Sequence, residues 1–328
     1  MADTSCKYMG LQLQSPLIAG SCGLTNSVEK MKQMEDCGMG AVVLKSIFEE
    51  QITNEVMQSV ENINFDVSYR DALDYIKGYT KMASYDKYTQ LIRDAKKELS
   101  VPVIASINCS SDGDWASYAK RIEDAGADAL ELNIFFLPSD FNKMGKENED
   151  LYFKIIEHVR KSIQIPLAIK TGYYFSGLAK MLQMLSYTGV DALVLFNRFF
   201  APDIDIEKMQ LKAASIFTEG EGFSNTLRWI ALMYGHVKCN LSATSGVKDA
   251  DDVIKQLLAG ADTVQLATTL YANGIDYTKT ILDGVKNWMD KHNYASIDDF
   301  KGKMSFKNID NPEAYLRIQF MKYFAGIE

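Results

Sequence analysis

A repeated pattern of hydrophobic and polar positions is the clearest feature of the chain. Four times, a stretch with the spacing of an amphipathic helix is followed by a glycine turn and a short apolar run. Glycine can close a helix because it adopts positive φ at no steric cost. The run that follows has the length and residue types of a strand buried on both faces. These units begin at Cys37, Ala125, Thr188 and Ala259.

Four further apolar runs bring the number of predicted strands to eight. Two of them begin with proline, which a strand tolerates at its first residue because no ladder hydrogen bond is lost there. The predicted strands cover about residues 16–20, 41–45, 102–107, 128–133, 166–170, 191–196, 238–243 and 262–267. Helical patterns lie between most of them, at 115–125, 151–162, 178–187, 226–234 and 250–259.

Strict alternation of strands and helices predicts a parallel sheet, and eight units favour closure into a single (β/α)₈ TIM barrel of class α/β. The barrel is expected to be one domain over 1–328, with a core of about 7–303 and a short C-terminal extension of about 304–328. Residues 7–14 read as an N-terminal hairpin that closes the barrel bottom. Inserted loops are expected after strands 2, 4 and 6, at about 46–85, 134–150 and 197–224, all on the functional face.

Charge and composition narrow the classes of partner. With 35 basic and 43 acidic residues the formal net charge is −8, which argues against nucleic acid and anionic membranes as partners. The five cysteines form no CxxC pair, so we expect no disulfide framework and no metal site. Reduced thiols and the lack of an apolar leader favour a cytoplasmic protein. A small-molecule substrate and a homodimer are compatible with this sequence.

Polar residues end most of the predicted strands. Six of the eight finish in Lys, Asn or Thr after an apolar run. The strand ends read Ala19-Gly20-Ser21, Lys45-Ser46, Asn108, Asn133, Lys170-Thr171, Asn197, Thr244-Ser245-Gly246 and Ala267-Thr268-Thr269. A single polar residue of this kind ordinarily marks only the point where a strand leaves the hydrophobic core. The same coincidence at six strands predicts a functional mouth, because side chains at the carboxyl ends of barrel strands converge on one site.

Two features of this mouth indicate an anionic ligand. The turn at Ser245-Gly246 precedes a helix, and the loops after strands 7 and 8 are the usual phosphate position in this fold. Lys45 and Lys170 end apolar strands, where a lysine is costly unless it meets an anion or a polar ligand. The alternatives are an ordinary glycine turn and two lysines whose stems lie along the surface.

These strand ends together resemble the FMN-dependent dihydroorotate dehydrogenases, more the soluble class 1 type than the membrane-linked type. The resemblance covers about 7–303. It rests on Tyr8-Met-Gly-Leu-Gln-Leu-Gln-Ser-Pro-Leu-Ile-Ala-Gly-Ser21, Lys45-Ser46, Asn108, Glu131-Leu-Asn133, Lys170, Asn197, Ser245-Gly246 and Gly260-Ala-Asp-Thr-Val-Gln-Leu-Ala-Thr-Thr269.

The resemblance implies roles for these residues. FMN would be held by Ala19, Gly20, Ser21, Lys45, Ser46, Asn108, Asn133, Lys170, Asn197, Ser245, Gly246, Thr268 and Thr269. Among them Lys170 would face the N1/C2 carbonyl edge of the flavin, and Gly246, Thr268 and Thr269 would hold the phosphate. The substrate would meet Lys45, Asn133, Asn197 and Arg198. The reaction implied is oxidation of dihydroorotate to orotate, with Lys45 and Lys170 among the catalytic residues.

Three departures from the family pattern fall on the substrate and the catalytic base. The position of the family's catalytic Cys is Phe136, and the nearest replacements are Ser139 and Asp140, of which Ser139 is the one we name as catalytic. The segment that grips orotate in the family has no counterpart at 78–86, and Arg198 stands where a small hydroxyl residue is usual. A related flavoenzyme acting on another dihydropyrimidine or enoyl substrate, or a flavin- or phosphate-binding barrel without redox turnover, therefore remains an alternative.

Overall fold

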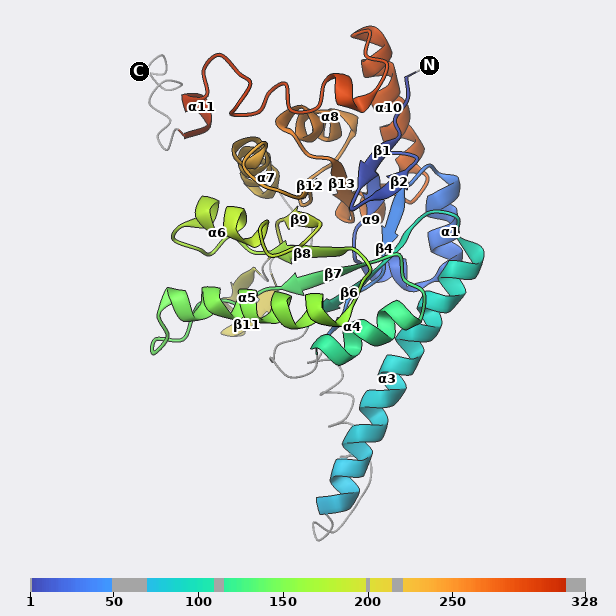
Figure 1. The fold of residues 1–328 in the computed structure, drawn as a ribbon, viewed down its shortest axis with the longest axis vertical. Coiled ribbons are helices and arrows are strands. Elements are labelled where there is room, and N and C mark those ends of the chain that lie inside the picture. Colours follow the sequence, from blue (N-terminus) through green and yellow to red (C-terminus); the bar gives the residue numbers. More distant parts are fainter. Residues whose placement is uncertain (1, 49–69, 109–114, 199–200, 214–220, 317–328) are drawn as a thin grey trace.

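A closed barrel of eight parallel strands forms the centre of the computed structural model, which describes residues 2–48, 70–108, 115–198, 201–213 and 221–316 (Figure 1). The barrel strands are β3 (Leu17–Ala19), β4 (Ala41–Val43), β6 (Val103–Asn108), β7 (Ala129–Ile134), β8 (Leu167–Thr171), β9 (Ala192–Leu195), β12 (Asn240–Ala243) and β13 (Thr263–Leu266). Each pairs in parallel with the next, and β13 returns to pair with β3, which closes the sheet. The predicted (β/α)₈ barrel is confirmed.

Helices surround this sheet and connect its strands. They are α1 (Val28–Asp36), α3 (Arg70–Glu98), α4 (Trp115–Asp124), α5 (Gly145–Ser162), α6 (Leu178–Leu185), α7 (Glu221–Met233), α8 (Ala250–Ala259), α9 (Thr268–Asn273) and α10 (Tyr277–Lys291). Shorter turns are η1 (Gly23–Asn26), η2 (Ile297–Asp299) and α11 (Glu313–Leu316). The five helices predicted between strands are all present, and α8 has the expected bounds.

A small hairpin fills the bottom of the barrel, as the sequence predicts. Its strands β1 (Cys6–Tyr8) and β2 (Leu11–Leu13) pair antiparallel. Tyr8, Met9 and Leu13 form one buried cluster with residues of the barrel strands. Four of those barrel residues are alanines: Ala41, Ala129, Ala168 and Ala192. We infer that these small side chains leave the space that the larger hairpin side chains occupy.

The insertions contain more regular structure than expected. The predicted loop 46–85 holds strand β5 (Ile47–Phe48) and, from Arg70, the start of α3, whose first turns extend beyond the rest of the molecule (Figure 1). Stretch 78–86 is therefore helical. The helix is hard to recognise from its sequence because α3 is only weakly amphipathic. Likewise α5 begins at Gly145, inside the loop expected at 134–150, because Glu147 accepts from the Met144 N–H at 2.7 Å.

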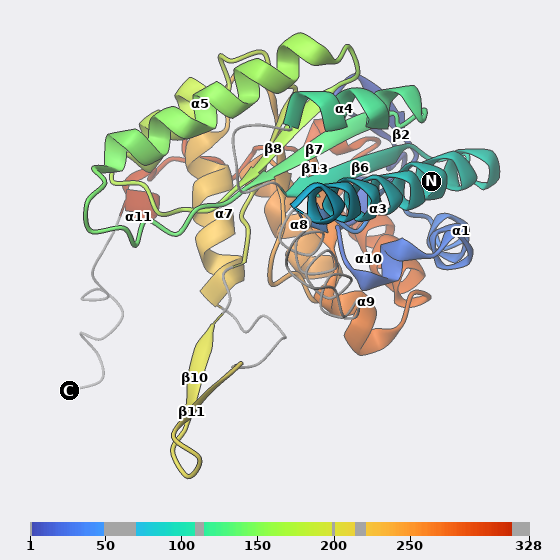
Figure 2. The same cartoon turned by 90° about the horizontal axis from the view of Figure 1, so that it is seen from below.

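The third insertion, expected as a loop at 197–224, carries a second hairpin. Its strands β10 (Pro202–Asp205) and β11 (Gln210–Ala213) pair antiparallel and project from the body of the molecule (Figure 2). Helix α7 then begins at Glu221, before the expected end of the loop. The hairpin has alternating residues but few bulky apolar ones, so the sequence pattern for a buried strand did not reveal it.

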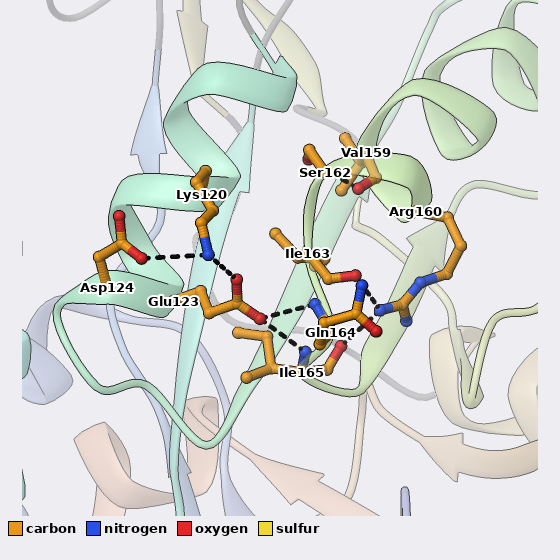
Figure 3. Close-up of polar contacts among 9 residues, drawn as sticks. All are labelled: Lys120, Glu123, Asp124, Val159, Arg160, Ser162, Ile163, Gln164 and Ile165. Atoms are coloured by element: carbon orange, nitrogen blue, oxygen red, sulfur yellow. Dashed lines mark hydrogen bonds and ion pairs between the residues drawn. The ribbon is translucent and has the colours of Figure 1, made fainter.

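The loop that leads into β8 is fixed by side chains of the neighbouring helices (Figure 3). The Glu123 carboxylate, near the end of α4, accepts from the N–H groups of Gln164 and Ile165 at 2.6 and 3.0 Å. From α5, the Arg160 guanidinium donates to the carbonyls of Ile163 and Ile165. These contacts hold the start of the strand that carries Lys170 at its other end.

Other expectations concern the chain as a whole. No helix among the described residues is long and apolar enough to cross a membrane. The single domain over 1–328 with its core of about 7–303 and extension of about 304–328, the homodimer and the cytoplasmic location stay predictions.

Candidate functional site

A cavity of about 400 Å³ lies at the carboxyl ends of the barrel strands. Ten of the residues predicted for the site line it: Ser21, Lys45, Ser46, Asn133, Lys170, Asn197, Arg198, Ser245, Gly246 and Thr268. They come from different strands and are brought together only by closure of the barrel. The size is within the range of small-molecule sites. The remaining described lining residues are Cys22, Phe48, Glu131, Phe196, Thr244, Val247, Gln265 and Ala267.

Five of the predicted site residues do not line this cavity. Ala19 is fully buried in β3, and the Gly20 N–H donates to the Leu266 carbonyl at 2.8 Å. Asn108 ends β6 beside Phe48. The Thr269 hydroxyl donates to the Lys248 carbonyl at 2.9 Å. Ser139 is exposed in the loop after β7. None of these five residues therefore lies directly against the cavity.

The floor of the cavity holds three linked polar side chains. The Lys170 ammonium, on β8, donates to Gln265 Oε1 at 3.2 Å. The Gln265 amide, on β13, donates to Glu131 Oε2 at 2.7 Å. Glu131, on β7, is only 1% exposed. This chain of contacts spans the barrel beneath the site.

Two asparagines join the ends of neighbouring strands. The Asn197 side-chain amide donates to Asn133 Oδ1 and, at 3.2 Å, to the Lys170 carbonyl. The Asn197 N–H also donates to the Thr171 carbonyl at 2.8 Å. These bonds tie the ends of β7 and β8 to the segment after β9, so the two amides and Lys170 stay in a fixed relation.

Hydroxyl groups line the opposite side of the site. The Ser46 hydroxyl lies 2.9 Å from that of Ser21 and 2.7 Å from that of Ser106, and the Ser46 N–H donates to Ser21 Oγ at 2.8 Å. The Tyr88 hydroxyl donates to the Ser106 carbonyl at 2.9 Å, and burial raises the pKa of Tyr88 above its ordinary value. Lys45 and Ser46 also line a second cavity of about 510 Å³ against α3.

The turn after β12 has a backbone that suits close approach of a ligand. Ser245 and Gly246 both have positive φ, of 77° and 76°. A Cβ at Gly246 would come within 2.8 Å of the Phe223 backbone nitrogen, so no other residue fits there without a shift. The Ser245 hydroxyl donates to the Phe196 carbonyl at 3.1 Å. Thr268, at the start of α9, lies across the same cavity.

The charges of the described lining residues favour an anionic ligand. Lys45, Lys170 and Arg198 are cationic, whereas Glu131 is the one acidic side chain among them. The chain as a whole carries a formal charge of −8, so this concentration of positive charge is local. Clefts lined by one sign of charge attract ligands of the other sign.

Phe136 belongs to an aromatic cluster next to the site. Its ring meets that of Tyr152 edge-on at 5.6 Å between centroids, and Tyr152 meets Phe175 at 5.2 Å. A hydrocarbon ring cannot accept a proton. Ser139 and Asp140 are exposed in the following loop, where Asp140 accepts from the Asn142 N–H at 3.0 Å. The position of Ser139 thus gives no support to its predicted role as the base.

Several lining residues escaped the sequence reasoning. Gln265 and Glu131 lie inside apolar runs of the kind that is typical of buried strands. A signal was present, since Glu131 and Asn133 are two residues apart and so face the same side of a strand. Cys22 and Phe196 adjoin predicted site residues but belong to types that are ordinarily core.

Comparison with known proteins gives a consistent result. A family model described as dihydroorotate dehydrogenase matches residues 4–289. The catalytic subunit of dihydroorotate dehydrogenase B (NAD(+)) from Thermoplasma acidophilum is 25% identical over 306 residues, covering 92% of this chain and 99% of that protein. Its counterpart from Methanosarcina acetivorans is 25% identical over 299 residues, covering 89% and 93%. The NAD-dependent dihydropyrimidine dehydrogenase subunit PreA of Escherichia coli is 23% identical over 321 residues, covering 92% and 76%.

Proposed function

The chain belongs to the dihydroorotate dehydrogenase family, and from this premise we propose that it is an FMN-dependent dehydrogenase that oxidises a carbon–carbon single bond, with dihydroorotate as the first candidate substrate. The observation that carries the proposal is the convergence of Lys45, Lys170 and Arg198 on one cavity at the barrel mouth. FMN and dihydroorotate are both anions with hydrogen-bonding ring edges. A lining that combines cations with amide groups suits both.

The residues present fit FMN. At one end, the positive-φ turn at Ser245 and Gly246, with Thr268, suits a phosphate group, which backbone N–H groups and hydroxyls can bind. At the other, Lys170 and Gln265 offer a cation and an amide, the groups that match the polar edge of a flavin ring. Bound FMN would supply the two-electron acceptor that the side chains of this protein lack.

The protein's own residues would bind and orient the substrate. Lys45 and Arg198 attract a carboxylate, while the amides of Asn133 and Asn197 are held by each other and by the Lys170 carbonyl. Because those amides are already fixed, little conformational entropy is lost when a substrate binds to them. Phe48 and Phe196 are part of the lining, where their apolar rings would exclude water from a bound substrate.

A proton must also leave the substrate, and Phe136 cannot take it. Besides the Glu131 carboxylate, which already accepts from Gln265, the groups among the described lining residues that could take up a proton are the Cys22 thiol and hydroxyls such as those of Ser21 and Ser46. Ser46 is the best connected of them, because its hydroxyl lies within hydrogen-bond distance of both Ser21 and Ser106. We therefore assign Ser46, in place of Ser139, as the first candidate for the proton acceptor.

A second candidate function is oxidation of a different dihydropyrimidine. Phe136 in the place of the expected base and Arg198 beside Asn197 are the observations that favour a changed substrate. Dihydrouracil and dihydroorotate differ in the carboxylate, so Arg198 and Lys45 should decide between them. Loss of preference for the carboxylate in Arg198→Ala would link that residue to recognition.

The absorption spectrum of the purified protein is the first test. We expect flavin bands, released as FMN on denaturation, and bleaching of those bands when dihydroorotate is added under anaerobic conditions. Bleaching by dihydrouracil alone would favour the second candidate. Bound flavin that no dihydropyrimidine or enoyl compound reduces would favour a flavin-binding barrel without turnover, and a protein that takes up no flavin would refute the proposal.

A further inference from the structure

A buried carboxylate lies directly beneath the proposed flavin site. Glu131 lines the cavity, is only 1% exposed, and has one oxygen, Oε1, that meets no hydrogen-bond partner among the described residues. Placing an ionised carboxylate in such surroundings is costly unless it is compensated. An uncompensated oxygen at the floor of a binding cavity therefore points to a role at that cavity.

Glu131 fixes the orientation of Gln265. A glutamine side chain has one acceptor oxygen and one donor nitrogen, and either can face a given neighbour. The Glu131 carboxylate can only accept, so it takes the Gln265 nitrogen, at 2.7 Å. The Gln265 oxygen is then turned to the other side, where it accepts from the Lys170 ammonium at 3.2 Å.

The same arrangement places a negative charge behind the Lys170 ammonium. Opposite charges separated by a bridging amide in a poorly solvated interior attract each other more strongly than they would in water. From below, the hairpin contributes Tyr8, whose pKa is raised well above its ordinary value by burial and further by the Glu131 charge. The influence of Glu131 thus reaches across the barrel lumen.

We infer that Glu131 is a positioning residue that acts through Gln265 to hold the Lys170 ammonium at the floor of the site and to offset its charge. This inference rests on the proposed function, since it assumes that the flavin lies on this floor. A flavin gains negative charge on reduction, which the Lys170 cation favours. Glu131 opposes that preference, and so keeps the flavin a stronger reductant than Lys170 alone would allow.

The reduction potential of the bound flavin tests the inference without any substrate. In Glu131→Gln, which removes the charge and retains the shape, the equilibrium constant for two-electron reduction should rise about tenfold, which is about 30 mV. Glu157→Gln is the matched control, because Glu157 is 62% exposed on α5 and forms an ion pair with Lys161, away from the cavity lining. Both are titrated anaerobically against a reference dye, alongside the wild type.

Gln265→Met provides a second route that keeps both charges. It removes the acceptor of Lys170, so the ammonium turns all its protons toward the cavity and the potential should again rise. A raised potential in either folded variant, with Glu157→Gln unchanged, supports the inference. A potential that is unchanged or lowered in the folded flavin-bound variants overturns it and leaves the proposed function standing, whereas a wild type that binds no flavin removes the proposed function itself.

Discussion

Lys170 is the residue on which the proposed chemistry depends most directly. It is the cation on the floor of the cavity, held by Gln265 and by its place at the end of β8. Removing a preorganised group that stabilises developing charge typically slows a reaction by about 10²–10³. We expect Lys170→Ala to slow flavin reduction by that factor in anaerobic stopped-flow measurements.

Lys170→Arg serves as the control for this prediction. It keeps the charge but not the shape, so its rate should lie between those of wild type and Lys170→Ala. Flavin content is measured in each variant, so that loss of cofactor is not mistaken for slow chemistry. Reduction of Lys170→Ala at the wild-type rate would contradict the assigned role.

At the scale of single residues, the sequence located most of the cavity but missed two of the three polar residues on its floor, Glu131 and Gln265. Lys45, Lys170, Asn133 and Asn197 could be found because a polar residue that follows an apolar run is conspicuous. Glu131 stands within such a run, and only the alternation of side chains along a strand separates it from its buried neighbours. The path of a loop depends on contacts between residues distant in the sequence, so the sequence does not show which loop residues reach the cavity. Ser139 is an example, because it was expected at the site but is exposed in the loop after β7.

At the scale of elements, the strands followed from their pattern and the insertions did not. Barrel strands are apolar on both faces, and four of them follow a glycine turn, so even short ones are recognisable. Helix α3 lacks a regular apolar stripe, and hairpin β10–β11 leaves the large apolar side chains Ile204 and Leu211 exposed. Neither element shows the strong apolar periodicity on which sequence prediction relies.

The loop before β8 gives a prediction at this scale. Burial by itself raises the pKa of Glu123, but the Lys120 ammonium and the N–H groups of Gln164 and Ile165 outweigh it, so the pKa lies below its ordinary value. Glu123→Ala leaves those two N–H groups without their acceptor and should lower the free energy of unfolding by about 1–2 kcal/mol near neutral pH. Urea unfolding followed by tryptophan fluorescence measures this.

The pH dependence of that loss identifies its source. A carboxyl whose folded pKa is lowered stabilises the fold above its unfolded pKa, and that stabilisation disappears as the pH falls through the folded pKa. The difference between wild type and Glu123→Ala should therefore shrink below about pH 4. Asp124→Ala is the matched control, since Asp124 is 62% exposed and should matter by less than about 0.5 kcal/mol. Equal losses in both variants would contradict the anchoring role.

At the scale of the whole molecule, the two ends of the barrel differ in function. The bottom is closed by the hairpin and the alanine-lined lumen, and its residues contribute stability. The mouth carries the cavity and the charged groups. This division could be predicted from the sequence, because polar residues gather at the carboxyl ends of the strands and the hairpin at 7–14 is expected at the other end.

Two thiols at the closed end provide a test of this division. Burial, with the nearby Asp262 charge, raises the pKa values of Cys6 and Cys239 from 9.0 to about 12. Between those pH values the unfolded chain releases both thiol protons and the folded chain keeps them, so the free energy of unfolding falls as the pH rises. By pH 10.5 the loss should be on the order of 1 kcal/mol for each thiol.

The double variant Cys6→Ala/Cys239→Ala should lose less stability than the wild type between pH 8 and pH 10.5, because lysines and tyrosines titrate in both proteins and only the thiol contribution is removed. Ser242→Ala is the matched control: Ser242 is a buried group of the same region that does not titrate and receives a hydrogen bond from Thr263 at 2.9 Å. Ser242→Ala should lower the free energy of unfolding at every pH without changing the slope of that free energy against pH. Since the thiols lie at the opposite end of the strands from the mouth, flavin content should be the same in all three proteins. If the free energy of unfolding of the double variant fell with pH as steeply as that of the wild type, these thiols would not couple folding to pH.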